Sequence, residues 1–162
     1  MRIAAAVMAL FLVAASSAAA DPIYLDQLME MPLATLQQHF PTLRNEGCYQ
    51  IAADRFLLIG MDKKDQKPWR VALSSTAPCK RPQKGPAMDV RERTGVDLGT
   101  KTREVLDKLG RPDASAPPEP AFKRLGETEY FYICRVTEGC ARHTSVFMRD
   151  GIVTGIASWY SD

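Results

Sequence analysis

The chain has 162 residues, of which 46% are hydrophobic and 25% are charged. This composition excludes an intrinsically disordered chain, a collagen-like fibre and a polytopic membrane protein. Lys and Arg number 21 against 19 Asp and Glu, which leaves a formal net charge of +2. That excess is too small for a basic stripe along a phosphate backbone, so we exclude nucleic acid as a partner. A small globular domain remains.

Residues 1–20 have the pattern of a secretory signal peptide, with cleavage expected after Ala20. Arg2 supplies the positive start, residues 3–15 are apolar, and Ala18 to Ala20 provide the small residues before the cleavage site. The apolar run would cover only about 20 Å of a hydrocarbon core of about 30 Å, so it is too short for a membrane-spanning helix. The first cysteine is Cys48, so no lipid-bearing cysteine follows the signal. We expect a periplasmic or secreted protein without a stable membrane anchor.

Four cysteines remain in the mature chain: Cys48, Cys79, Cys134 and Cys140. An even number in an oxidising compartment predicts two disulfides, and three pairings are open. The spacing of Cys134 and Cys140 suits a bridge across a short turn, whereas Cys48 with Cys79 would close a longer loop. A zinc site formed with His143 is the alternative, but the six-residue spacing of Cys134 and Cys140 does not match the usual ligand pairs. We therefore predict no metal and no cofactor.

The first unit, residues 21–75, is predicted to contain one helix and three strands. Pro32 suits a first helical position, Leu33, Leu36 and Phe40 share a face, and Pro41 ends the helix. The three strands are expected at residues 48–53, 55–61 and 69–74, with a polar turn at 62–67. In the last strand, Trp69, Val71 and Leu73 alternate with polar or small residues, which predicts one covered face.

A connector rich in Pro and Lys, residues 76–93, separates the first unit from the second, residues 94–162. The second unit begins with a helix at 101–109, which Gly110 and Pro112 end. Strands follow at 129–135, 143–149 and 152–160, and Asp150-Gly151 is the signal for a tight hairpin between the last two. The order of one helix and three strands thus occurs twice, and either an internal duplication or coincidence accounts for it.

Residues 96–112 carry a family resemblance in the run VDLGTKTREVLDKLGRP. It resembles the helix signature of the SmpA/OmlA outer-membrane assembly proteins and the fold that they share with β-lactamase inhibitor protein (BLIP). The resemblance implies an α+β, two-layer fold of tandem helix-plus-antiparallel-sheet units, whose sheets form a concave surface for a protein partner. The chain departs from the family at Lys101, where a capping Thr or Ser is usual, and in the absence of a lipid-bearing cysteine.

The search for catalytic residues yields no site, and we do not expect an enzyme. His39 and His143 are the two histidines, and Ser145 lies two residues beyond His143. A small hydrolase would require a solvent-filled pocket that holds His143 with a carboxylate. The acidic pairs Glu127 with Glu129 and Asp62 with Asp65 lie in polar segments, where solvated carboxylates are expected. No glycine-rich phosphate-binding loop is present.

Aromatic residues on the second sheet are the positive signal for function. Alternation along the strand places Tyr130 and Tyr132 on one side and Phe131 and Ile133 on the other, and we predict that the more apolar pair faces the core. Tyr130, Tyr132 and Trp159 are therefore the predicted partner contacts, because exposed Tyr and Trp dominate interface energetics. Two residues of the 62–67 loop, Asp62 and Lys63, complete the predicted contact set.

We therefore expect an exported protein that binds another protein. Its role would be that of an inhibitor or immunity protein, which caps a periplasmic or secreted enzyme. The alternative is a non-lipidated accessory of an outer-membrane or envelope assembly complex, and a small secreted hydrolase is the third class considered.

Overall fold

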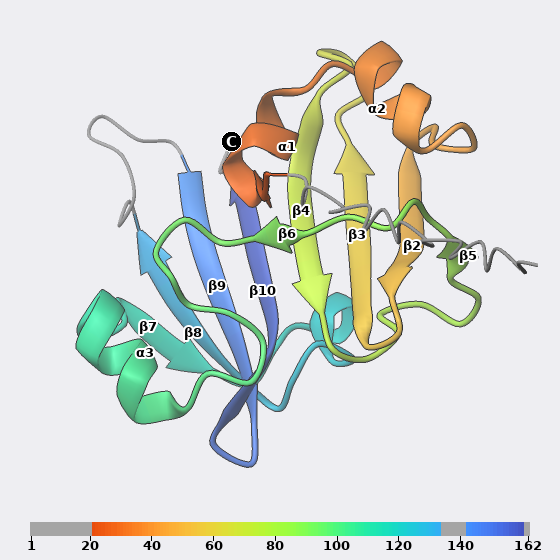
Figure 1. The fold of residues 1–162 in the computed structure, drawn as a ribbon. Coiled ribbons are helices and arrows are strands. Elements are labelled where there is room, and N and C mark those ends of the chain that lie inside the picture. Colours follow the sequence, from red (N-terminus) through yellow and green to blue (C-terminus); the bar gives the residue numbers. More distant parts are fainter. Residues whose placement is uncertain (1–20, 134–141, 161–162) are drawn as a thin grey trace, which may run out of the picture.

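The computed structural model describes residues 21–133 and 142–160 (Figure 1). The predicted signal peptide lies outside the described residues, and so do Cys134 and Cys140 with their predicted bridge. Within the described part, no helix has the length and apolar character needed to cross a membrane.

The chain forms short helices and a larger number of strands, so the predicted α+β class is confirmed. Residues 21–75 contain β1 (Ile23–Tyr24), α1 (Leu25–Glu30), α2 (Leu33–His39), β2 (Glu46–Ala52), β3 (Arg55–Met61) and β4 (Pro68–Ser74). The connector contributes β5 (Gln83–Lys84) and β6 (Val90–Arg91). The second unit contains α3 (Thr102–Leu109), β7 (Ala114–Ala116), the 3-10 helix η1 (Pro120–Phe122), β8 (Thr128–Ile133), β9 (Arg142–Arg149) and β10 (Ile152–Tyr160).

Eight strands form one sheet in the order β5-β2-β3-β4-β10-β9-β8-β7. Within it β5 pairs with β2 in parallel, and the other neighbours are antiparallel. The pairing of β4 with β10 joins the strands of the two units, with Leu73 opposite Ile156. The first unit therefore supplies three strands, the connector one and the second unit four strands to one continuous sheet.

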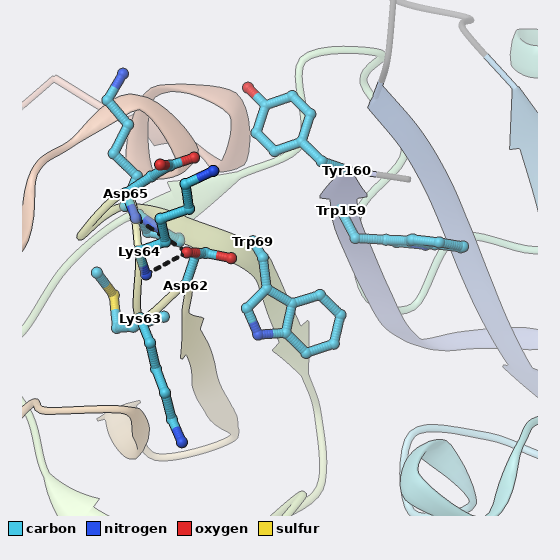
Figure 2. Close-up of a pocket in the computed structure, with 10 residues that line it drawn as sticks. Asp62, Lys63, Lys64, Asp65, Trp69, Trp159 and Tyr160 are labelled. Atoms are coloured by element: carbon cyan, nitrogen blue, oxygen red, sulfur yellow. Dashed lines mark hydrogen bonds between the residues drawn. The ribbon is translucent and has the colours of Figure 1, made fainter. Parts of the chain in front are cut away.

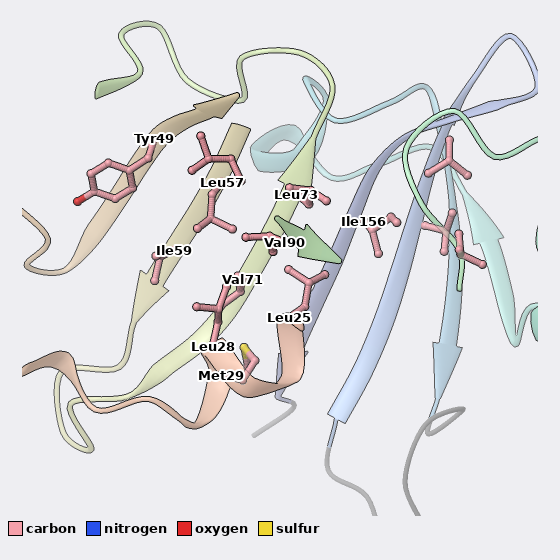
Figure 3. Packing of buried hydrophobic residues seen from close by; sticks show 14 of the residues in the cluster. Leu25, Leu28, Met29, Tyr49, Leu57, Ile59, Val71, Leu73, Val90 and Ile156 are labelled. Atoms are coloured by element: carbon pink, nitrogen blue, oxygen red, sulfur yellow. The ribbon is translucent and has the colours of Figure 1, made fainter. Parts of the chain in front are cut away.

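The main hydrophobic core lies between this sheet and a layer formed by α1, α3 and β6, which lie in front of the sheet in Figure 1. Leu25, Leu28 and Met29 of α1 pack against buried side chains of β3 and β4, as Figure 3 shows. Val90 of β6 and Val105 of α3 complete this layer and are fully buried. Each buried aliphatic side chain contributes about 1.5–3 kcal/mol, which explains how such short helices are held in place.

Cys48 and Cys79 form a disulfide that links β2 to the connector. Of the three pairings that the sequence left open, the structure therefore has the one that joins these two cysteines. Near it, β5 of the connector pairs with β2, with Gln83 opposite Tyr49. At the other end of the connector, the predicted helix is present as α3 and ends at Gly110, whose φ of 74° suits glycine. Lys101 is the N-cap residue and makes no side-chain capping hydrogen bond.

The predicted facing of β8 is wrong. Tyr132 is 0% exposed and belongs to the core beneath α3, and Tyr130 packs against the same core, whereas Ile133 is 47% exposed. The reason is that the Tyr132 ring fills apolar space while its hydroxyl donates a hydrogen bond to the carbonyl of Gly110 at the end of α3, 3.4 Å away. A tyrosine can thus be buried without an unsatisfied hydroxyl, and Phe131 turns to the opposite face.

Candidate functional site

The sheet face opposite α1, α3 and β6 carries the candidate site, and we call it the open face. Because side chains alternate along a strand, the residues between core positions project here. They include Glu46, Leu58, Arg70, Ala72, Glu129, Phe131, His143, Ser145, Phe147 and Trp159. Part of the open face is covered by the segment around η1, whose Phe122 and Leu125 pack on a second small apolar cluster.

Three rings from neighbouring strands meet on the open face. The ring centroids of Phe131 and His143 are 5.1 Å apart, those of Phe131 and Trp159 are 5.5 Å apart, and those of His143 and Trp159 are 4.9 Å apart. Trp159 Nε1 donates a hydrogen bond to Ser145 Oγ at 3.2 Å, and Ser145 Oγ donates to Glu129 Oε1 at 2.6 Å. This chain of hydrogen bonds across β10, β9 and β8 fixes the orientation of the Trp159 indole.

His143 and Ser145 lie on one face, as residues two apart on a regular strand should. The hydroxyl proton of Ser145 is nevertheless directed to Glu129, and the described contacts of His143 are to aromatic rings. His143 is 9% exposed, and its Nδ1 has no hydrogen-bond partner. The hydrogen bond between nucleophile and base that a Ser/His mechanism requires is therefore not formed in this structure.

A second aromatic group lies beside the first. The guanidinium carbon of Arg70 is 4.5 Å from the ring centroid of Trp69 and 5.3 Å from that of Phe122, and Arg70 forms an ion pair with Glu46. Gly60 on the neighbouring strand leaves room for this stack, because a Cβ there would lie 2.9 Å from Arg70 Cγ and 3.0 Å from Trp69 Nε1. The planar guanidinium therefore lies against both rings.

At one end of the sheet, the 62–67 loop and the two tryptophans enclose a groove of about 830 Å³, which we call the rim groove. Figure 2 shows the loop on one side and Trp69, Trp159 and Tyr160 on the other. The carboxylate of Asp62 accepts hydrogen bonds from the backbone N–H groups of Lys64 at 2.6 Å and Asp65 at 3.0 Å. These two hydrogen bonds hold the pKa of Asp62 below its ordinary value, and the bond from Asp65 lowers it more than the bond from Lys64.

The structure brings some of the predicted contact residues together and separates others. Asp62, Lys63 and Trp159 all line the rim groove. Tyr130 and Tyr132 lie on the opposite side of the sheet, in and against the core, so they cannot belong to this surface. Asp62 also has a structural role, because its carboxylate holds the turn of its own loop.

Sequence reasoning missed three members of the open face: Trp69, Arg70 and Phe122. Alternation predicted Trp69 on the covered face with Val71, but Trp69 is 38% exposed and lies against Arg70. The β3–β4 register shifts between Gly60 and Met61, and this irregularity breaks the simple alternation at the start of β4. Gly60 inside an apolar strand was the available signal, because an isolated glycine in a strand marks a bulge or a close approach.

Within the described residues, no group of three or more His, Cys, Asp or Glu side chains is placed to hold a metal ion. In comparisons with family models, curated proteins and solved structures, nothing matched this chain. The resemblance to the SmpA/OmlA and BLIP fold therefore stays a prediction from the sequence.

Proposed function

We propose that this chain is an exported binding protein that caps a partner protein through the open face of its sheet. The observation that carries the proposal is the pair of oriented aromatic groups on that face, Phe131–His143–Trp159 and Trp69–Arg70–Phe122. Trp and Arg are enriched among the residues that dominate binding energy. Side chains that are already held in one orientation lose little conformational entropy on association, which favours affinity.

The inhibitor or immunity role follows from the resemblance stated above, and two features support export. The Cys48–Cys79 disulfide fits an oxidising compartment, and the predicted signal peptide would deliver the chain there. In this role the open face and the rim groove would cover a periplasmic or secreted enzyme, with Trp69, Trp159 and Lys63 at the contact.

The test is an affinity capture followed by a direct binding measurement. The mature chain, residues 21–162, is immobilised and exposed to periplasmic extract, and each retained protein is purified and its affinity measured. Trp69→Ala tests the open face, because this side chain is partly exposed and its loss should leave the fold intact. Leu106→Ala is the matched control, because Leu106 is 39% exposed on α3, on the other side of the sheet.

We expect Trp69→Ala to weaken the affinity at least about tenfold and Leu106→Ala to leave it unchanged. Circular dichroism spectra and thermal unfolding check that both variants are folded. Equal affinity of both variants for every retained protein would refute the open face as the binding surface. Recovery of an outer-membrane assembly complex in place of a single enzyme would support the accessory role instead.

A further inference from the structure

A second hollow on the open face lies apart from the rim groove, and we call it the basic hollow. Its volume is about 360 Å³, and its lining includes Glu46, Cys48, Leu58, Arg70, Cys79 and Arg81. Leu58 and the disulfide provide an apolar floor. Ala121 of η1 also lines the hollow.

Four cations stand on the two segments that border the basic hollow. Lys80 and Arg81 follow Cys79, and Lys123 and Arg124 follow η1. All four are exposed, and within the described residues none of them forms an ion pair. The two segments are tied together, because Thr76 Oγ1 donates a hydrogen bond to the carbonyl of Arg124 at 3.0 Å. Arg81 lines the hollow itself, and the two segments that contribute Cys79 and Ala121 to its lining therefore carry an excess of positive charge.

The single carboxylate that lines the basic hollow is that of Glu46, and it is bound to Arg70. The Arg70 side chain is only 14% exposed, whereas that of Glu46 is 55% exposed, so Glu46 can leave while Arg70 stays in place. The Nε of Arg70 is buried and has no hydrogen-bond partner. The terminal nitrogen of Arg70 that binds Glu46 is therefore the donor that an incoming carboxylate would take over, on a guanidinium already oriented by the two rings.

We propose that the basic hollow receives an acidic surface loop of the partner protein, and that a partner carboxylate replaces Glu46 on Arg70. This inference rests on the proposed function, since it names the chemistry of the partner on the same open face. The four exposed cations attract the acidic loop over a longer range and accelerate association. Glu46 occupies the site in the free protein and lowers its affinity for weakly acidic surfaces.

A protein loop fits the basic hollow better than a bilayer does. The Arg70 side chain in the hollow is only 14% exposed, so a flat layer of lipid headgroups would not reach it. The floor formed by Leu58 and the disulfide favours a ligand that places apolar atoms beside its carboxylate, as the side chains of a peptide loop do.

The first experiment selects peptides from a phage-displayed random library on the mature chain. The same selection is run on a quadruple variant, Lys80→Glu/Arg81→Glu/Lys123→Glu/Arg124→Glu. A control variant, Lys101→Glu/Arg103→Glu, reverses charge at exposed positions on and beside α3, on the other side of the sheet. Thermal unfolding checks that every variant is folded.

We expect the wild type and the control to select peptides enriched in Asp and Glu, and the quadruple variant to lose this enrichment. A selected acidic peptide should associate more slowly with the quadruple variant than with the wild type. The affinity of this peptide for the wild type should fall about tenfold or more as the salt concentration is raised. Glu46→Gln should strengthen the binding of this peptide by up to about fivefold, since an ion pair with one exposed partner opposes the exchange by no more than about 1 kcal/mol.

The outcomes separate this inference from the proposed function. One outcome is that the selected peptides bind the wild type but not Trp69→Ala, show no enrichment in Asp and Glu, and bind the quadruple variant as well as the wild type. This outcome would refute the acidic partner while supporting the open face. Selection of no peptide would refute the acidic loop as the occupant of the hollow, whereas the affinity of Trp69→Ala for the retained proteins decides the open face. Binding to vesicles of equal parts phosphatidylglycerol and phosphatidylcholine without acidic peptide selection would assign the hollow to a membrane surface. A dimer of the chain that the quadruple variant abolishes would assign it to a second copy, and either result overturns the inference.

Discussion

Removal of the Cys48–Cys79 disulfide should lower the free energy of unfolding by an amount that its loop length predicts. The two cysteines are 31 residues apart, and the loop-closure entropy that the bridge removes from the unfolded chain corresponds to about 3.7 kcal/mol at room temperature. Domains of this size are stable by about 5–15 kcal/mol, so the loss is a large fraction of the total. The variant Cys48→Ala/Cys79→Ala should therefore remain folded but unfold at a much lower urea concentration.

Urea unfolding followed by tryptophan fluorescence measures this loss. Because the unfolded variant is less constrained, it should expose more surface, and the dependence of the free energy on urea should become steeper. Cys48 packs against the small cluster that contains Leu58, so Cys48→Val/Cys79→Ala is the matched control that restores apolar volume without the bridge. A deficit below about 1 kcal/mol with an unchanged slope would refute loop closure as the source of the stabilisation, as would full recovery in the control.

Three further predictions concern individual groups. Burial raises the pKa of Asp26, but the hydrogen bond and the charge of Arg93 outweigh burial and lower the pKa overall. The free energy of unfolding should therefore fall as the pH drops through the lowered pKa of the folded state. Asp26→Asn should remove this acid-dependent part of the stability, up to about 1 kcal/mol, in urea unfolding measured at several pH values. Burial, with a hydrogen bond to a glutamate of α1, raises the pKa of Tyr160 to about 12. The contribution of the protonated Tyr160 to the free energy of unfolding is complete below a pH of about 10 and is lost as the pH rises through about 12. Tyr160→Phe should remove the ionisation step near this pH from an ultraviolet titration of the protein. A Cβ in Gly126→Ala would lie 2.8 Å from Met148 N and should cost about 1–3 kcal/mol by urea unfolding, so an unchanged midpoint would contradict this packing.

Local sequence patterns predicted most of the regular elements. The helix after Pro32 and the helix before Gly110 are present as α2 and α3, because apolar spacing and helix-ending residues act within a few residues of the chain. The hairpin at Asp150-Gly151 joins β9 to β10, and both residues adopt the positive φ that this turn requires. Helix α1 was missed, because its six residues are too few to show a helical period and its stability comes from burial in the core.

The candidate site was predicted only in part, and the error on β8 shows why. Alternation correctly separated Tyr130 and Tyr132 from Phe131, but it carries no information about which side of the strand meets the helices. That choice depends on α3, whose terminal carbonyl at Gly110 satisfies the hydroxyl of Tyr132. The open face was therefore assigned to the wrong side of this strand.

By itself the sequence determined the α+β class, the two helices after Pro32 and before Gly110, and the three main strands that follow each of them. These properties depend on hydrophobic period and turn chemistry, which neighbouring residues decide. Only the tertiary structure decided that β4 pairs with β10, so that Trp159 lies opposite Arg70, and that Phe122 stacks on the same guanidinium. Such contacts join residues far apart in the chain, and they form only when burial of the whole core selects one arrangement of the strands.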